Sequence, residues 1–291
     1  MYRQRHTKQF IGSQIGICLM QNFSPSPVEI VSSFWRNYTL IKVMATRQIT
    51  GRYRGSFIGI LWAFFNPLFT LAVYTFVFSV ILGSRWNLES DSKTEFALVL
   101  FCGLIVFNLF AECINNAPNS ILSNVNYVKK VVFPLEILPW VTLASVAFHA
   151  MVSWSVWLTA YFIFFGMPHV TVLFLPLVML PLMLFVIGFS WWLASLGVYL
   201  RDASQFVGIA VNVMMFMSPI FYPVTAIPEQ FRWFLFLNPL TIIIEQVREV
   251  MFWGNYPDLE KLGISLTIGL LVASMGFAWF QKTRKGFADV I

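Results

Sequence analysis

Long apolar stretches without charge dominate the 291-residue chain, and short segments between them hold most of its charged residues. Crossing the roughly 30 Å apolar core of a bilayer takes about 20 residues of helix. A turn at 166–169, with Gly and Pro, divides one apolar interval that is too long for a single helix. The pattern therefore predicts six transmembrane helices, at about 57–83, 96–116, 139–165, 171–199, 203–224 and 260–280.

The first of these helices begins directly after a basic segment and contains a proline. Arg52 and Arg54 precede it, the next charged residue is Arg85, and Asn66 and Pro67 lie within it. A proline inside a membrane helix frees a backbone carbonyl, which is tolerated where neighbouring helices or water bind that carbonyl. We therefore expect a kink at Pro67 in a helix that faces protein or a channel rather than lipid.

Residues 28–51 predict an amphipathic helix that lies along the membrane surface. Ser26, Pro27 and Glu29 form a typical helix start, with a capping serine and a proline in the first turn. Aromatic and apolar residues then recur at helical spacing opposite basic ones, a pattern typical of interfacial helices. The alternative, a packed helix of a soluble domain, has no other soluble segment to pack on. The apolar positions are Val31, Phe34, Trp35, Tyr38 and Ile41.

Residues 221–258 predict two short helices rather than another crossing. The segments 231–237 and 240–253 are helical in pattern and are separated at Asn238-Pro239, whereas a seventh crossing would place the basic C-terminus outside. Non-helical backbone at membrane depth needs shielding by protein or by a water-filled cavity. We expect a re-entrant hairpin on the outer side, between the fifth and sixth transmembrane helices, that shapes a gate. The outer-gate candidates are Pro228, Trp233, Asn238, Pro239, Glu245 and Arg248.

The basic residues predict the orientation. With both termini in the cytoplasm, 14 of the 19 Lys and Arg residues fall on the inner side, as the positive-inside rule requires. Only 11% of the residues are charged, whereas a soluble domain has about 25%. The expected fold is therefore an all-α integral membrane protein, with residues 1–27 as a cytoplasmic tail rather than a cleaved signal peptide. The same distribution explains the net charge of +6 without nucleic acid.

The sequence contains no visible catalytic motif and no Gly-rich phosphate loop with its Lys-Ser/Thr end. Its Cys and His residues are dispersed, so no metal site is predicted. Within the predicted helices, Glu112 and His149 are the only clear ionisable candidates for an ion pathway, which disfavours an ion-driven carrier. Glu112 is interpreted as an interfacial carboxylate. His149 is interpreted as a hydrogen-bonded packing residue, with a proton relay as the alternative.

Aromatic residues make up 18% of the chain and crowd the third and fourth helices. Lipid contact and interfacial belts explain most of them. A second interpretation is a pore wall, because aromatic faces pack against the apolar faces of sugar rings without fixing them. The channel candidates are Trp62, Phe65, Trp154, Trp157, Tyr161, Trp191, Trp192, Phe221 and Tyr222.

Short polar turns on the predicted cytoplasmic side offer a surface for a partner protein. The alternative is that their charges only set the topology. The coupling candidates are Arg47, Arg52, Arg54, Asn119, Asn124, Lys129, Lys130, Arg201 and Asp202.

Several motifs resemble, in the expected order, those of ABC-2 type permeases that export bacterial surface polysaccharides. This group includes the O-antigen, group-2 capsule and teichoic acid exporters. The matching residues cover about 29–291 and include the Arg-Tyr-Arg-Gly-Ser opening at 52–56. The other matches are Gly59, Leu61-Trp62, Asn66-Pro67-Leu68, 131–139 with its Phe-Pro-Leu-Glu core, Tyr199–Asp202, Ser218-Pro219-Ile220, Asn238-Pro239-Leu240 and 286–290.

The resemblance implies a homodimer in the bacterial inner membrane that works with two copies of a cytoplasmic ABC ATPase subunit. The ATPase subunit would bind ATP and Mg. This chain would then have no cofactor and no enzymatic activity of its own. The polymer would pass through a channel at the dimer interface while attached to undecaprenyl-diphosphate or another lipid. The amphipathic helix 28–51 and the inner loops of the 52–291 transmembrane domain would face the ATPase. Two alternatives remain: an ABC-2 permease for a small drug or lipid, and a membrane scaffold that transports nothing.

Overall fold

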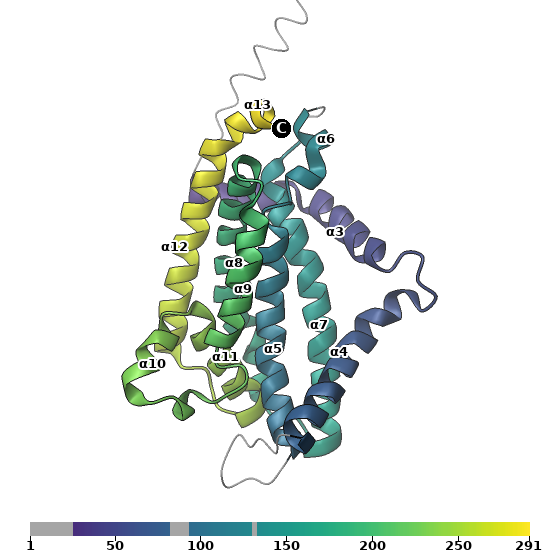
Figure 1. Cartoon of the computed structure of the whole chain (residues 1–291), viewed down its shortest axis with the longest axis vertical. Helices are drawn as coiled ribbons and strands as arrows, with labels where there is room; N and C mark the ends of the chain where they lie inside the picture. The colour runs from purple at the N-terminus through teal and green to yellow at the C-terminus, as the bar shows by residue number, and fades with distance from the viewer. Residues whose placement is uncertain (1–25, 82–92, 130–132) are drawn as a thin grey trace, which may run out of the picture.

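The structure is a computed structural model that describes residues 26–81, 93–129 and 133–291 (Figure 1). All the regular elements in these ranges are helices, which confirms the all-α fold. Five of them are long and apolar enough to cross a membrane: Gly59–Val77, Thr94–Asn116, Leu135–Phe165, Val170–Tyr199 and Leu259–Val290. Predictions for most of the N-terminal tail, for the end of the first transmembrane helix and for Lys130 lie outside the described residues.

The fifth predicted transmembrane helix is shorter than expected. The helix α9 (Ala203–Met217) has 15 residues, about 22 Å at about 1.5 Å per residue, and it does not reach 224. It ends because Pro219 disfavours helical backbone at the residue before it, and Ser218 is extended with φ −94° and ψ 144°. The structure therefore contains five full-length apolar helices and one short one in the described residues.

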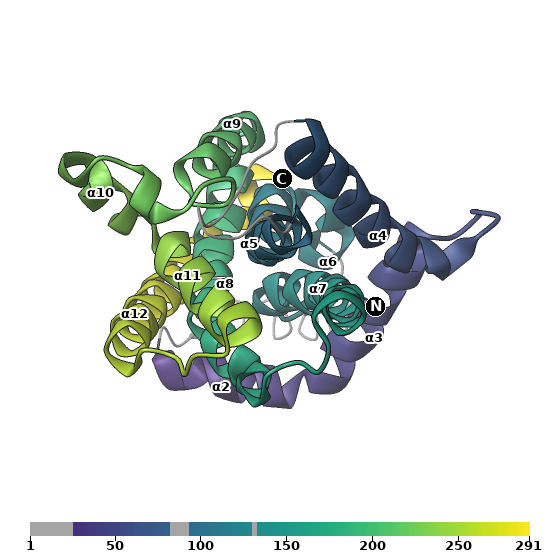
Figure 2. The ribbon, with the colours of Figure 1, turned by 90° about the horizontal axis from the view of Figure 1, so that it is seen from below.

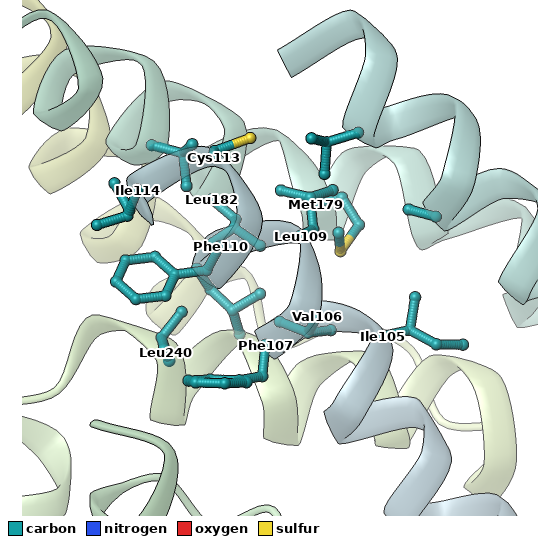
Figure 3. Packing of buried hydrophobic residues seen from close by; sticks show 14 of the residues in the cluster. Ile105, Val106, Phe107, Leu109, Phe110, Cys113, Ile114, Met179, Leu182 and Leu240 are labelled. Atoms are coloured by element: carbon teal, nitrogen blue, oxygen red, sulfur yellow. The ribbon is translucent and has the colours of Figure 1, made fainter. Parts of the chain in front are cut away.

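Helix α5 (Lys93–Asn116) lies at the centre of the bundle (Figures 1 and 2). In its apolar window 83% of the residues are buried, against 11% in the window of Gly59–Val77. A helix that is apolar all round is expected to be buried on every side. Its side chains pack on α7 (Leu138–Phe165), α8 (Leu175–Tyr199) and α11 (Pro239–Arg248), and Figure 3 shows part of this core.

Helices α8 and α12 (Leu259–Thr283) pack together with their backbones in close contact. Gly188 of α8 lies against Gly276 of α12, and a Cβ atom on either glycine would overlap the backbone of the other helix. Small residues at such crossings are typical of packed membrane helices.

The predicted interfacial segment forms two helices rather than one. Helix α2 (Pro27–Arg36) ends at Asn37, whose side-chain amide donates to Ser33 O at 2.9 Å, and α3 (Tyr38–Arg52) follows. Asn competes with the helical hydrogen bonds in this way, which explains the break. In Figures 1 and 2 the two helices run across the bundle, and in Figure 1 they begin near the end that carries α13 (Phe287–Val290).

The predicted apolar stripe of this segment is divided between two environments. Trp35 is 69% exposed and Val31 and Tyr38 are also exposed, whereas Ile41 is buried and Phe34 packs on Trp140 at 4.9 Å between ring centroids. The exposed aromatic face is accessible to a membrane surface, and the interfacial position of this segment stays a prediction.

Helix α4 (Trp62–Tyr74) continues into a π-helical segment (Thr75–Ile81) and leans away from the bundle (Figure 1). Pro67 lies inside it as expected, and only Ala63 and Leu71 of α4 are buried. This helix is therefore the least enclosed of the long apolar ones in the described residues.

Two short helices follow α9, as predicted. Helix α10 (Glu229–Phe236) ends before Asn238, and α11 begins at Pro239 and continues as a π-helical segment (Glu249–Trp253). Figure 1 places both at the end of the bundle opposite α13. Their depth in the membrane stays a prediction. The remaining short helices are Gly59–Leu61, Leu122–Asn124, α6 (Val125–Lys129), Leu135–Ile137, Val170–Phe174, Val224–Ala226 and Arg284–Gly286.

Candidate functional site

A polar cleft of about 420 Å³ lies between α3, the segment that leads into α6, and α7. Three coupling candidates from two distant parts of the chain, Arg47 and the pair Asn119 and Asn124, share its lining. Arg47 and Asn119 are exposed, so both side chains are accessible to a partner. The other polar side chains of the lining are Gln48, Asn116, Ser120, Ser123, Tyr127 and Thr142.

The remaining coupling candidates lie outside this cleft. Arg201 and Asp202 are exposed in the turn between α8 and α9, at the α13 end of the bundle (Figure 1). Arg54 is exposed after α3. The side chain of Lys129 and the whole of Lys130 lie outside the described residues.

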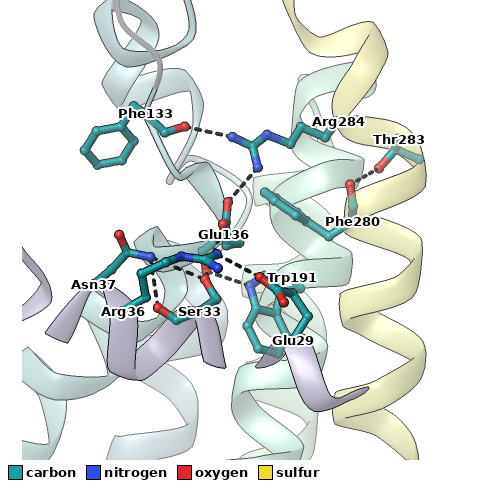
Figure 4. A network of polar contacts seen from close by, with 10 residues as sticks. All are labelled: Glu29, Ser33, Arg36, Asn37, Phe133, Glu136, Trp191, Phe280, Thr283 and Arg284. Carbon is teal, nitrogen blue, oxygen red and sulfur yellow. Dashed lines mark hydrogen bonds and ion pairs between the residues drawn. The ribbon is translucent and has the colours of Figure 1, made fainter. Parts of the chain in front are cut away.

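A buried ion pair joins the segment before α7 to the C-terminal end of α12 (Figure 4). Glu136 Oε2 accepts from Arg284 Nη1 at 2.6 Å, and Arg284 Nη2 donates to Phe133 O at 2.7 Å. The hydroxyl of Ser33 donates to Glu136 Oε1 at 3.3 Å, and Trp191 Nε1 donates to Glu136 O at 2.9 Å. The pair therefore ties four segments together at the α13 end.

Sequence reasoning assigned no role to Glu136 or Arg284, although both lie in or beside the motifs that carried the resemblance. The two residues are 148 positions apart, so no local pattern links them. Trp191 was a channel candidate, but its side chain is fully buried and binds the Glu136 backbone carbonyl.

The exposed edge of α2 carries a second, local ion pair (Figure 4). Arg36 donates to Glu29 at 2.7 Å, and the Ser32 hydroxyl donates to the same carboxylate at 2.8 Å. The hydrogen bond from Arg36, supported by that from Ser32, lowers the pKa of Glu29. The Glu29 side chain therefore stays charged and links the first turn of α2 to its last turn.

A second polar cavity, of about 320 Å³, lies between the end of α3, α4, α5 and α7. Arg52 forms an ion pair with Glu112, and the Tyr53 hydroxyl lies 3.2 Å from His149 Nδ1. Burial alone lowers the pKa of Arg52, but the hydrogen bond and charge of Glu112 outweigh that effect and raise it. The structure thus brings together the two ionisable residues that the apolar helices were expected to contain, Glu112 and His149.

Arg248 is an outer-gate candidate that the structure places in the interior, with 1% of the residue exposed. Its guanidinium donates to Pro219 O at 2.7 Å, Ile220 O at 2.9 Å and Val99 O at 3.2 Å, and to Glu245 Oε1 at 2.8 Å. Three of these acceptors are backbone carbonyls, two of them just after α9 ends. The burial and the carbonyl partners indicate that Arg248 stabilises this irregular backbone rather than facing an opening.

Asn238 has a related role, since it is buried and links the break between α10 and α11 to the residue that follows α9. Its Oδ1 accepts from Leu240 N at 3.0 Å and caps α11, and its Nδ2 donates to Ser218 Oγ at 2.8 Å. Pro239 occupies the first turn of α11, where a missing N–H costs nothing. Pro228 and Trp233 are exposed, and Glu245 keeps 40% of its side chain exposed, so these gate candidates remain accessible.

Three channel candidates of α7 form part of the core. Trp154, Trp157 and Tyr161 are all buried, and the Trp157 and Tyr161 rings are stacked at 5.0 Å between centroids. Trp157 Nε1 donates to Leu98 O on α5 at 2.9 Å. Their burial within a single chain favours the packing interpretation over an open pore wall.

The other channel candidates lie closer to the surface. Trp192 is 38% exposed, and Trp62, Phe65, Phe221 and Tyr222 are half-buried. These five side chains are accessible without any rearrangement of the core, so they remain candidates for contact with a cargo.

We expect Trp157→Phe to lower the free energy of unfolding by about 1–3 kcal/mol, because it removes a buried hydrogen bond and leaves the space of the five-membered ring empty. Thermal unfolding in detergent measures this change. Trp192→Phe on the exposed side of α8 is the matched control and should change stability by less than about 0.5 kcal/mol. Equal effects of the two variants would contradict the packing role.

The sequence of the chain is similar to a transporter family and to several bacterial export proteins. A family model described as ABC-2 type transporter matches residues 39–252. An O-antigen export system permease protein, RfbA, of Klebsiella pneumoniae is 27% identical over 255 residues, covering 87% of this chain and 95% of the relative. A protein of the same name from Myxococcus xanthus is 24% identical over 91% of this chain and 100% of its own length. The polysialic acid transport protein KpsM of Escherichia coli is 24% identical over 87% of this chain and 96% of its own length.

Proposed function

The chain belongs to the ABC-2 type transporter family, and from this premise we propose that it is the permease subunit of an ATP-driven polysaccharide exporter. Its cargo is a lipid-linked, O-antigen-like surface polysaccharide, which crosses the bacterial inner membrane through a channel between two copies of this chain. The observation that carries the proposal is the match, over almost their whole length, to permeases named for O-antigen export.

The energy source in this proposal is a separate ATPase subunit, present in two copies. The sequence of the chain shows no phosphate loop for ATP. Because the chain belongs to an ABC transporter family, we expect ATP to bind a separate ATPase subunit. The cleft lined by Arg47, Asn119 and Asn124 is a suitable docking surface, since it is polar, accessible and built from three separate segments.

Deleting the gene tests the cargo. If the proposal holds, the cell accumulates lipid-linked polysaccharide inside and loses it from its surface, and a plasmid copy of the gene reverses both changes. Unchanged surface polymer would reject polysaccharide export and favour a small-molecule cargo or a scaffold. The chemical identity of the retained polymer distinguishes an O-antigen from a capsule or a teichoic acid.

Charge reversal in the cleft tests the docking surface. We expect Arg47→Glu to reduce co-purification of the ATPase subunit about tenfold, because an unfavourable charge at an interface costs more than 1 kcal/mol. Lys261→Glu is the control, since it makes the same reversal of charge on an exposed residue at the start of α12, far from the cleft in the fold. Equal recovery of the ATPase with both variants would exclude this cleft as the docking site.

A further inference from the structure

Two cavities lie side by side under α4, and their chemistry differs. The polar cavity described above, of about 320 Å³, contains Arg52, Glu112 and His149. The second cavity, of about 500 Å³, is lined almost entirely by apolar side chains of α4, the π-helical segment that continues it, α5 and α7. Leu68, Phe76, Leu98, Val156, Ile163 and Phe164 represent its lining.

The lining positions continue from one cavity to the next along both supporting helices. On α7 the polar cavity ends at Ser153 and the apolar one begins at Val156, one helical turn later. On α5 the same change occurs between Phe101 and Leu98. From Glu112 to Thr94 the distance along α5 is about 27 Å at about 1.5 Å per residue, close to the roughly 30 Å apolar layer of a bilayer. The two cavities therefore follow one another along α5 and α7, the polar one toward the end of α3, and on α4 their linings overlap between Phe64 and Thr70. Together they make one groove, polar toward the α3 end and apolar toward the other.

The wall formed by α4 is weakly held. Six of its 13 residues are exposed and only two are buried, and Pro67 interrupts its hydrogen bonds beside the polar cavity. Leu68, the next residue, already lines the apolar cavity. A long, flexible molecule therefore has access to the groove between α4 and the rigid surface of α5 and α7.

The polar end carries one positive and one negative side chain, Arg52 and Glu112, which are only partly buried. The Nε2 atom of His149 is buried and has no hydrogen-bond partner in the part of the chain that the structure describes. With opposite charges of equal size, this end is poorly suited to a diphosphate, whose several negative charges would face Glu112. It is well suited to a headgroup that carries both a phosphate and an ammonium group.

We propose that this groove binds one zwitterionic glycerophospholipid of the membrane, with its phosphate at Arg52, its ammonium at Glu112 and an acyl chain along the apolar cavity. The bound lipid fills the space beneath α4 and holds this helix at a fixed distance from α5 and α7. This lipid is distinct from the lipid that carries the cargo, so the inference does not depend on the proposed function.

Lipid titration of the full-length protein tests the proposal. Delipidated protein in detergent is titrated with phosphatidylethanolamine or with phosphatidylglycerol, and thermal unfolding is recorded, since a ligand that binds the folded state raises Tm. We expect phosphatidylethanolamine to raise Tm at concentrations about tenfold lower than phosphatidylglycerol does, because the anionic lipid has no ammonium group for Glu112. Equal effects of the two lipids, or no effect of either, would overturn the proposal.

Two variants locate the effect. Ala160→Phe fills the apolar cavity, and we expect it to weaken the response to phosphatidylethanolamine about tenfold. Met275→Phe introduces the same side chain on the exposed face of α12, outside the groove, and should leave the response to phosphatidylethanolamine unchanged. If both variants respond like the unmodified protein, the groove is not the binding site.

Glu112→Gln keeps the shape of the polar end but leaves Arg52 uncompensated. The preference should then reverse in favour of phosphatidylglycerol, a result that damage to folding cannot produce. A retained preference for phosphatidylethanolamine would contradict the assigned role of Glu112. Because all these measurements report lipid binding rather than export, their failure leaves the proposed function untouched.

Discussion

Arg248→Ala is expected to destabilise the protein by about 3–5 kcal/mol, the cost typical of removing one partner of a buried charge network. The guanidinium binds two carbonyls that follow α9, at Pro219 and Ile220, and a third at Val99 on α5. Without it these carbonyls lose their donor in a water-poor interior, and each buried polar group without a partner costs about 1–3 kcal/mol. Glu245 would also lose its partner at 2.8 Å.

Thermal unfolding and the yield of monodisperse protein in detergent measure the effect. Arg248→Lys should recover only part of the stability, because one ammonium group cannot span carbonyls on three sides. The control is Arg232→Ala, which removes a partly exposed arginine of the same hairpin and should cost about 1 kcal/mol or less. Near-normal stability of Arg248→Ala would show that the end of α9 holds its conformation without this side chain.

The second large effect is expected at the Glu136–Arg284 pair. Arg284→Ala leaves the Glu136 carboxylate buried beside a single serine hydroxyl, so we expect a loss of about 3 kcal/mol and lower export. The functional loss follows because the ion pair holds Phe133 and Glu136, just after α6, against α12. In the function proposed above the ATPase docks at the cleft that Tyr127 of α6 helps to line, so this pair would carry movement from that cleft to α12.

A double-mutant cycle separates the pair from its surroundings. Glu136→Gln, Arg284→Ala and the double variant should give a coupling energy of about 1–3 kcal/mol, within the range for contacting residues. Lys282→Ala is the control, since Lys282 is exposed two positions before Arg284. A coupling energy near zero would mean that the two side chains act independently.

Helix positions followed well from the sequence where a local rule decides them. Pro27 begins α2, Asn238-Pro239 separates the two hairpin helices, and the apolar run ends near Thr283. Two local features were misread. The Asn37 side chain breaks the interfacial helix by binding Ser33 O, and Ser218-Pro219 ends α9 early, although the apolar pattern continues through both points.

The site was harder to predict because its contacts join distant segments. Trp157 and Trp191 were channel candidates, with lipid contact as the other interpretation, yet both bury their rings and donate to backbone carbonyls of other helices. An aromatic residue in an apolar helix has the same local pattern whether it faces a pore or the core. Glu112 and His149 were found because ionisable residues are rare in apolar helices, but their partners Arg52 and Tyr53 became visible only in the fold.

Export across a sealed membrane tests the central proposal most directly. Inverted inner-membrane vesicles that contain this chain and its ATPase are loaded with labelled lipid-linked polysaccharide on the outside, and a glycosidase then removes polymer that has not crossed. The account predicts that the polymer is protected from the glycosidase only when ATP, this chain and the ATPase are all present. Protection that is the same without ATP, or in vesicles lacking this chain, would contradict it.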